Sequence, residues 1–289
     1  MTPDSPTVAH ALAEAARRLA HTSDTARLDA EVLMAHALGV TRSDLILRHL
    51  RDGVPAGFAA LVDRRLGHEP VAYITGHQEF WGLDLVVSPA VLIPRGDTET
   101  LIEVAVDRLH ARPPARVIDL GTGSGALLLA ALSHWPLARG IGIDRSDAAL
   151  AVAQGNAERL GLRDRARMIP ADWTQEHWAE GLGRFDLVLA NPPYVESGAA
   201  LDASVMAHEP HGALFAGAEG LDDYRVILPQ LDRLLAPGGV ALVEIGWTQA
   251  EAVGALAREQ GLTARVHADL AQRPRVVEIV VDIDEIQRI

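Results

Sequence analysis

The sequence predicts an α/β protein in which a mostly parallel sheet is covered by helices on both faces and follows a small all-helical domain. Three observations predict this fold. Residues 7–73 show only helical periodicity, short apolar runs alternate with helical segments after Leu101, and a short loop joins the last two apolar runs.

The N-terminal region has the pattern of a bundle of amphipathic helices. In the first helix, apolar residues recur at helical spacing, namely Val8, Leu12, Ala15, Ala16 and Leu19. A second run covers 27–38, and Gly39 is placed to end it. Thr41 and Ser43 are candidate N-caps of the next helix, and residues 55–66 form a further one.

The character changes at residues 79–94, which read EFWGLDLVVSPAVLIP. Apolar side chains alternate there with polar or small ones, so the stretch predicts a β-hairpin between two domains. Five short apolar runs then predict the parallel strands, at Arg116–Leu120, Gly140–Asp144, Arg167–Pro170, Asp186–Ala190 and Val240–Glu244. Ala264–Ala268 and Val276–Val281 predict a closing hairpin.

Composition excludes several kinds of chemistry. The chain has no cysteine and no lysine, which rules out disulfides, thiol nucleophiles and lysine Schiff bases. Its net charge of −13 argues against a nucleic-acid backbone as partner. The 12 histidines show no metal-binding spacing, so no metal is expected. No segment predicts a membrane span or a secretion signal, and we expect a cytoplasmic protein.

A glycine-rich loop follows the first predicted strand of the sheet. It reads Gly121-Thr122-Gly123-Ser124-Gly125 and leads into a helix. Glycines allow a tight turn and a close approach to a ligand, and the helix start offers N–H groups. Asp144, at the end of the next strand, can accept hydrogen bonds from both hydroxyls of a ribose. NAD and S-adenosylmethionine both carry a ribose, so these residues fit either cofactor.

Two more strand ends carry candidate ligand-binding residues. Asp172 and Trp173 follow the third strand, where the indole offers a flat face for a purine and the carboxylate an acceptor for an exocyclic amine. The fourth strand ends in Asn191-Pro192-Pro193-Tyr194. Proline fixes φ, so the Asn191 side-chain oxygen and the Pro192 carbonyl form a rigid pair of acceptors for one –NH₂ group, with Tyr194 placed to lie against it.

This corner predicts methyl transfer to an amide or aniline-like nitrogen. Asparagine is not a useful base, so the catalysis would rest on orientation and fixed dipoles. Nothing in the corner suits hydride transfer, and this favours S-adenosylmethionine over NAD. Such a motif fits adenine, cytosine and guanine amino groups as well as glutamine amides.

The chain also resembles a known family over nearly its whole length. The resemblance is carried by LDAEVLMAHALG (28–39), EPVAYITGHQEFWGLDLVVSPAVLIPRGDTETLIE (69–103), DLGTGSGA (119–126), NPPY (191–194), EPHGALFAG (209–217) and RPRVV (273–277). Together these segments resemble the peptide chain release factor N5-glutamine methyltransferases, the PrmC or HemK family.

The resemblance implies a class I methyltransferase that uses S-adenosylmethionine and has a Rossmann-like, seven-stranded sheet. It implies a helical substrate-recognition domain at 1–75, a hairpin linker at 76–94 and a methyltransferase domain at 95–289. The implied reaction methylates the glutamine of the Gly-Gly-Gln loop in class-1 release factors, without direct contact to nucleic acid or membrane. The alternatives are an amino methyltransferase acting on RNA or DNA, a glutamine methyltransferase acting on a ribosomal protein, and a non-enzymatic adaptor.

Family roles carry over to the matching residues. The resemblance assigns cofactor contacts to Gly121–Gly125, Asp144, Trp173 and Asn191, and the target glutamine to Asn191, Pro192, Pro193 and Tyr194. The stretch from Ile93 to Glu99 separates this family from the sister that methylates a ribosomal protein. Gly96 departs from the proline that is usual there, which predicts a less rigid loop.

Overall fold

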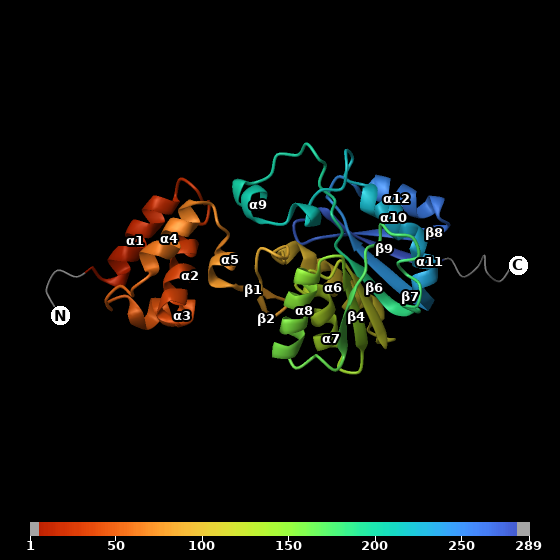
Figure 1. Ribbon diagram of the computed structural model, residues 1–289, viewed down its shortest axis with the longest axis horizontal. Coiled ribbons are helices and arrows are strands. Elements are labelled where there is room, and N and C mark those ends of the chain that lie inside the picture. The colour runs from red at the N-terminus through yellow and green to blue at the C-terminus, as the bar shows by residue number, and fades with distance from the viewer. Residues whose placement is uncertain (1–5, 282–289) are drawn as a thin grey trace, which may run out of the picture. The chain divides into compact units, whose positions relative to one another are not determined.

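The computed structural model describes residues 6–281, which fall into two compact units. Among these residues, the first unit comprises 6–77 and 201–209, and the second comprises 78–200 and 210–281. Residues 201–209, which carry the helix labelled α9 in Figure 1, are far along the chain from the rest of the first unit.

The first unit is built mainly of helices in the part described, with one isolated antiparallel bridge between Thr7 and Gly53. Its helices are α1 Val8–Leu19, α2 Ala26–Leu38, α3 Arg42–Asp44, α4 Phe58–Leu66, α5 Val71–Thr75 and α9 Ala203–His208, with a π-helical turn at Leu45–His49. The predicted helix end is confirmed, because Gly39 adopts the left-handed conformation with φ 66°. Thr41 caps α3 by accepting from the Asp44 amide, whereas Ser43 lies inside that helix and caps nothing.

The core of this unit follows from the helical periodicity of its sequence. The apolar stripes of α1, α2 and α4 face one another and bury Leu12, Leu19, Leu33, Met34 and Phe58. Residues at intervals of three and four meet because they share one face of a helix.

The second unit contains a hairpin and a seven-stranded sheet. The hairpin is β1 His77–Phe80 with β2 Leu83–Val86. The sheet strands are β3 Arg116–Leu120, β4 Arg139–Asp144, β5 Ala166–Pro170, β6 Phe185–Ala190, β7 Leu235–Glu244, β8 Leu262–Ala268 and β9 Pro274–Val281. The helices are α6 Glu99–Leu109, α7 Ala126–His134, α8 Asp147–Arg159, α10 Asp222–Ile227, α11 Leu231–Leu234 and α12 Ala250–Glu259.

The strand order is β5-β4-β3-β6-β7-β9-β8. Strands β3 to β7 pair in parallel, and β9 pairs antiparallel with both β7 and β8. The predicted fold class, a mostly parallel seven-stranded sheet with a closing hairpin, is confirmed.

Both faces of the sheet are buried. Leu187 and Leu189 of β6 pack on the side of α6, α7 and α8, while the alternating Val188 and Ala190 pack on the side of α10, α11 and α12. Figure 1 shows these two helical layers around the strands. Burial on both faces explains why the strands appear in the sequence as continuous apolar runs.

Two elements differ from the sequence prediction. The hairpin strands end at Val86, because Ser88-Pro89 cannot continue the ladder, and residues 87–95 form irregular chain instead. Strand β7 begins five residues early, at Leu235, which pairs with Phe185 before a register shift. The Pro237-Gly238-Gly239 segment lies inside this strand, although proline and glycine usually mark a turn.

Candidate functional site

A cavity of about 300 Å³ lies at the carboxyl ends of β3, β4, β5 and β6. Strand β3 lies between β4 and β6, so the chain crosses in opposite directions on its two sides. Ligands bind at such a switch point in open α/β sheets. The cavity is lined by the loops after these strands, by residues of the 90–98 stretch and by Pro210, Gly212 and Ala213.

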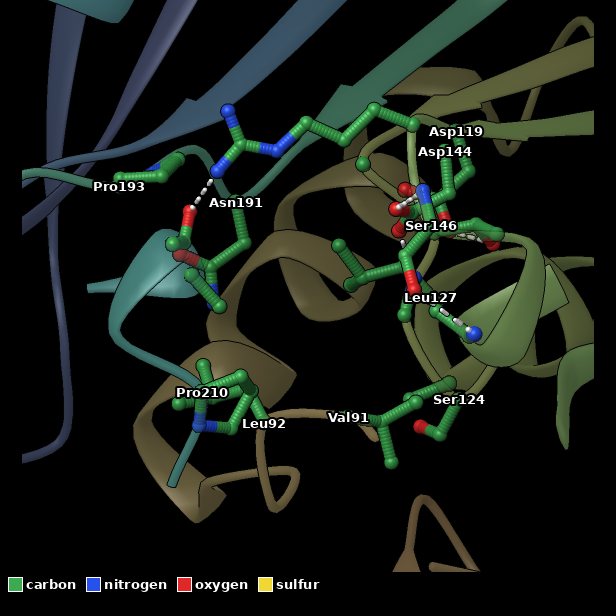
Figure 2. Close-up of a pocket in the computed structure, with 18 of the residues that line it drawn as sticks. Val91, Leu92, Asp119, Ser124, Leu127, Asp144, Ser146, Asn191, Pro193 and Pro210 are labelled. Atoms are coloured by element: carbon green, nitrogen blue, oxygen red, sulfur yellow. Dashed lines mark hydrogen bonds between the residues drawn. The ribbon is translucent and has the colours of Figure 1, made fainter. Parts of the chain in front are cut away.

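Figure 2 shows how the labelled side chains surround this cavity. Asp119, Asp144 and Ser146 lie on one side, and Asn191 and Pro193 lie opposite them. The sequence therefore predicted residues on both sides of one cavity. Of the predicted site residues, the lining includes Gly121, Thr122, Gly123, Ser124, Asp144, Asp172, Trp173, Asn191 and Pro193, and it does not include Gly125, Pro192 or Tyr194.

The glycine loop is held against the neighbouring strand. The amides of Gly121 and Thr122 both donate to the Ile143 carbonyl, at 2.9 and 2.8 Å. Gly121, Gly123 and Gly125 all have positive φ, which favours glycine. Gly125 allows the loop to pack closely on α7, because a Cβ at this position would lie 3.0 Å from the Leu129 side chain of that helix.

Gly121 leaves room for an aromatic ring. A Cβ at this position would lie 2.8 Å from Cη2 of Trp173, and φ is +74°. We therefore expect Gly121→Ala to weaken cofactor binding about tenfold, a loss of about 1.4 kcal/mol, because its Cβ would displace the Trp173 ring that lines the cavity. Isothermal titration calorimetry with S-adenosylmethionine checks this. Gly155→Ala is the matched control, because a Cβ there meets nothing within 4 Å and helix α8 favours alanine; equal affinities in the two variants would contradict the expectation.

Asp144 holds the glycine loop in place by hydrogen bonds and can still accept further hydrogen bonds from a ligand. Its Oδ2 accepts from the Gly123 amide at 3.0 Å, and its Oδ1 from the Ser146 amide at 2.9 Å. Each carboxylate oxygen has a second lone pair, so two hydroxyls of a ribose can still be bound. Ser146 in turn caps α8 by accepting from the Ala149 amide.

Asp119 is a site residue that the sequence analysis missed. It lines the cavity but is only 1% exposed, and its Oδ2 accepts from the Thr122 hydroxyl at 2.7 Å. Its Oδ1 is buried and has no hydrogen-bond partner among residues 6–281. Burial raises the pKa of this carboxyl to about 7, and the nearby Asp144 charge adds to the rise.

The raised pKa of Asp119 predicts a pH-dependent stability. The unfolded carboxyl loses its proton near its ordinary value of 3.8, while the folded one holds it to about 7. Folding stability therefore falls as pH rises through this window, by at most about 4 kcal/mol. We expect Asp119→Asn, which cannot ionise, to unfold in urea with a smaller loss of stability between about pH 5 and about pH 8. Parallel pH profiles for the variant and the parent would contradict this.

The third strand end brings Asp172 and Trp173 to the cavity. Oδ1 of Asp172 accepts hydrogen bonds from the backbone amide and the hydroxyl of Thr174. These bonds, the one from the hydroxyl most of all, lower the pKa of Asp172. The Trp173 indole N–H donates to Asp223 of α10 at 2.6 Å, which fixes the ring. The carboxylate thus stays charged beside an immobilised aromatic face.

The Asn191-Pro192-Pro193-Tyr194 corner lies at the end of β6. Nδ2 of Asn191 donates to the Thr98 hydroxyl at 3.3 Å, so the Asn191 oxygen is the atom left to accept from a ligand. Pro192 and Pro193 are buried. Tyr194 points to Glu244 at the end of β7, and its hydroxyl donates to Oε1 at 3.2 Å. Burial, followed by the Glu244 charge, raises the pKa of Tyr194.

Glu244, Thr98 and Arg275 were also missed by the sequence analysis. Glu244 is 2% exposed, and burial raises its pKa to about 7 against the opposing effects of Thr98 and Arg275. Arg275, at the start of β9, pairs with Asp97 at 3.0 Å and with Asp269 at 3.3 Å. The sequence offered one signal that could have identified Glu244 as a site residue: it ends a predicted strand, as Asp144 does.

Among residues 6–281, no helix is sufficiently long and apolar to span a bilayer. Over the same residues, no three histidine or acidic side chains gather in a way that could hold a metal ion.

Comparison with known proteins gives the family. Residues 112–289 match the family model described as a methyltransferase domain, and residues 10–76 match the PrmC N-terminal domain. The catalytic domain of hMettl16, solved in complex with the MAT2A 3'UTR hairpin 6, shares the fold with a TM-score of 0.54 at 16% identity, covering 70% of this chain and 76% of that one.

Two curated relatives match over nearly their whole length. The release factor glutamine methyltransferase of Moorella thermoacetica is 43% identical over 277 residues, which cover 93% of this chain and 96% of that protein. The protein of the same name from Caulobacter vibrioides is 41% identical over 262 residues, covering 88% and 89%. The identity and coverage of these relatives, together with the PrmC N-terminal domain, show that this chain belongs to the release factor glutamine methyltransferase family.

Proposed function

We propose that this protein transfers a methyl group from S-adenosylmethionine to the side-chain amide nitrogen of the glutamine in the Gly-Gly-Gln loop of class-1 release factors. The observation that carries the proposal is the Asn191 corner, which lies on the same cavity as the glycine loop and Asp144. The family relationship at 43% identity supports the same substrate.

The residues around the cavity fit the proposed cofactor. The amides of the glycine loop and Asp144 would hold the ribose side, while Asp172 and Trp173 would hold the purine. The unpartnered Oδ1 of Asp119 suits the positively charged amino group of the methionine portion, since an ionised carboxylate only accepts hydrogen bonds. When bound, the sulfonium supplies an electrophilic methyl group.

Asn191 and Pro192 would orient the nucleophile. The amide nitrogen of glutamine is a poor nucleophile because its lone pair is delocalised, and it carries two N–H bonds. The Asn191 side-chain oxygen and the Pro192 carbonyl would each accept one, which directs the lone pair at the methyl group and stabilises the developing positive charge. As the new N–C bond forms, the methyl–sulfur bond would break to leave S-adenosylhomocysteine, and the nitrogen would lose one of its two protons to water. Pro193 would line the cavity beside them. Tyr194 would stabilise the Asn-Pro-Pro-Tyr corner through its hydrogen bond to Glu244.

We also propose how the chain is organised around this reaction. The helical domain of residues 1–75 would recognise the release factor, the hairpin linker of 76–94 would follow, and residues 95–289 would carry out methyl transfer. Release factors act in translation, so the protein would work in the cytoplasm, without direct contact to nucleic acid or membrane.

Mass spectrometry of a release factor incubated with this protein and S-adenosylmethionine tests the proposal. We expect the mass of one methyl group on the glutamine of the Gly-Gly-Gln peptide. A release factor with that glutamine replaced by alanine is the control and should remain unmodified. Methyl transfer to another residue, to ribosomal protein or to RNA instead would overturn the assignment.

A further inference from the structure

The segment EPHGALFAG (209–217) has no part in the proposed methyl transfer, although three of its residues line the cavity. These residues are Pro210, Gly212 and Ala213. The Ala213 amide donates to the Pro210 carbonyl at 2.9 Å, so they form one tight turn, called here the 210–213 turn. In Figure 2, Pro210 lies on the opposite side of the cavity from Asp144. The turn is therefore one wall of the cavity.

The chain that follows the turn is anchored beside the Asn-Pro-Pro-Tyr corner. Val195 comes directly after that corner, and its amide donates to the Leu214 carbonyl at 2.8 Å. The Val195 carbonyl accepts from the Ala216 amide at 2.9 Å, and the Ser197 amide donates to the Gly217 carbonyl at 2.8 Å. These backbone hydrogen bonds fix one end of the turn to the end of β6.

Arg145 binds the turn from the side of β4. It follows Asp144 directly in the sequence, and its Nη2 donates to the Gly212 carbonyl at 2.8 Å. A Cβ on Gly212 would collide with Nη2 of Arg145, so glycine is what lets the guanidinium lie against the backbone here. Arg145 and Gly212 both line the cavity, and their hydrogen bond therefore joins two of its walls. A guanidinium stays charged in proteins, and a charged donor strengthens such a bond.

We propose that Arg145 is a positioning residue for the cofactor, which holds the 210–213 turn in place as a wall of the cavity and so slows the dissociation of S-adenosylmethionine. This inference rests on the proposed use of S-adenosylmethionine in this cavity. Arg145 would act on cofactor affinity and not on the methyl transfer step, because the orienting oxygens belong to Asn191 and Pro192.

Arg145→Leu tests the proposal, because leucine removes the donor and keeps an apolar side chain. We expect the dissociation constant for S-adenosylmethionine, measured by calorimetry, to rise about three- to tenfold, the effect of one hydrogen bond that water partly replaces. At saturating cofactor, kcat should stay within about twofold of the parent. Arg145→Lys keeps a charged donor and should recover part of the affinity.

Arg139→Leu is the matched control for Arg145→Leu. Arg139 is an exposed arginine of the same strand, β4, and its Nη1 donates to the Asp164 carbonyl at 2.9 Å. It lies at the other end of the strand and does not line the cavity. Its loss should therefore leave the affinity for S-adenosylmethionine close to that of the parent.

Gly212→Ala separates the role of the turn from a direct contact between Arg145 and the cofactor. It keeps the positive charge, but its Cβ displaces the guanidinium from the Gly212 carbonyl. We expect the same loss of affinity as in Arg145→Leu, and the double variant should lose little more than either one alone. Parent-like affinity in Gly212→Ala, with Arg145→Leu weakened, would overturn the inference. Gly155→Ala, where a Cβ meets nothing within 4 Å, is the control.

Hydrogen exchange without cofactor gives a reading that is independent of activity. The amides of Ala213 and Leu214 donate within the turn, to the Pro210 and His211 carbonyls. They should exchange faster in Arg145→Leu and Gly212→Ala than in the parent or Arg139→Leu, because the turn is less restrained. Unchanged exchange, or parent-like affinity in Arg145→Leu, would overturn this inference while the proposed function stands. A parent protein that does not bind S-adenosylmethionine would instead remove the proposed function itself.

Discussion

Replacing Asn191 with alanine is expected to lower kcat for release factor methylation by about 10²–10³, the usual cost of one oriented polar group at a reacting centre. The variant loses the oxygen that fixes the target nitrogen, but it keeps the Pro192 carbonyl and the cofactor loop. Asn191 is half-buried and its hydrogen bond within the protein is a long one, 3.3 Å to Thr98, so the fold should tolerate its loss. Initial rates with labelled S-adenosylmethionine at saturating release factor measure the effect.

Gln154→Ala is a suitable control for Asn191→Ala. It also removes a carboxamide, but from α8, where Nε2 of Gln154 donates to Glu158 of the same helix at 3.3 Å and the side chain does not line the cavity. We expect its kcat to match the parent. An Asn191→Ala variant that turns over as fast as this control would contradict the mechanism.

Removing the Asp144 carboxylate is expected to raise the dissociation constant for S-adenosylmethionine by about 10²–10⁴. Hydrogen bonds to a charged group contribute about 1.5–3 kcal/mol each, and the carboxylate would accept from two ribose hydroxyls. Asp144→Ala also frees the Gly123 amide that Asp144 now holds at 3.0 Å, so the cofactor loop loses part of its preorganisation. Calorimetry measures the affinity, and cofactor-induced stabilisation against heat provides a second reading.

Asp147→Ala controls for the loss of an acidic residue in the same region. Asp147 is exposed in the first turn of α8, three residues along the chain from Asp144, and does not line the cavity. Its affinity for the cofactor should stay close to that of the parent. If Asp144→Ala bound as tightly as Asp147→Ala, the carboxylate would not hold the ribose.

Much of the fold was predictable because each local signal agrees with the tertiary context. Strand β6 reads FDLVLA, and its residues alternate between two buried faces. Such a run can only be a strand covered on both sides or a buried helix, and its length with the following prolines decides for the strand. The glycine loop and Asp144 were found for the same reason, since both follow directly from strand ends.

The polar groups beneath the corner were not predictable in this way. Thr98 and Asn191 lie far apart in the sequence but form a hydrogen bond, and so do Tyr194 and Glu244, because the residues before α6 meet the carboxyl ends of β6 and β7. Thr98 taken alone is an ordinary residue at a helix start, and Glu244 an ordinary acid after a strand. Their contacts depend on how these elements pack, which sequence spacing does not carry.

The irregular chain after the hairpin has a similar explanation. Residues 88–95 alternate enough to resemble a strand, but Pro89 and Pro94 remove two ladder donors. The segment contributes Val91 and Leu92 to the cavity wall instead (Figure 2). An apolar loop of this kind is stable only because the cavity side of the sheet gives it something to cover.

The central claim is that two fixed, uncharged oxygens hold the target amide nitrogen in line with the sulfonium methyl group. A crystal structure of the protein with S-adenosylhomocysteine and a peptide carrying the Gly-Gly-Gln sequence tests it most directly. The account predicts that the glutamine nitrogen donates to Asn191 Oδ1 and the Pro192 carbonyl and faces the sulfur. A glutamine bound in the cavity with its amide turned away from both oxygens would contradict it.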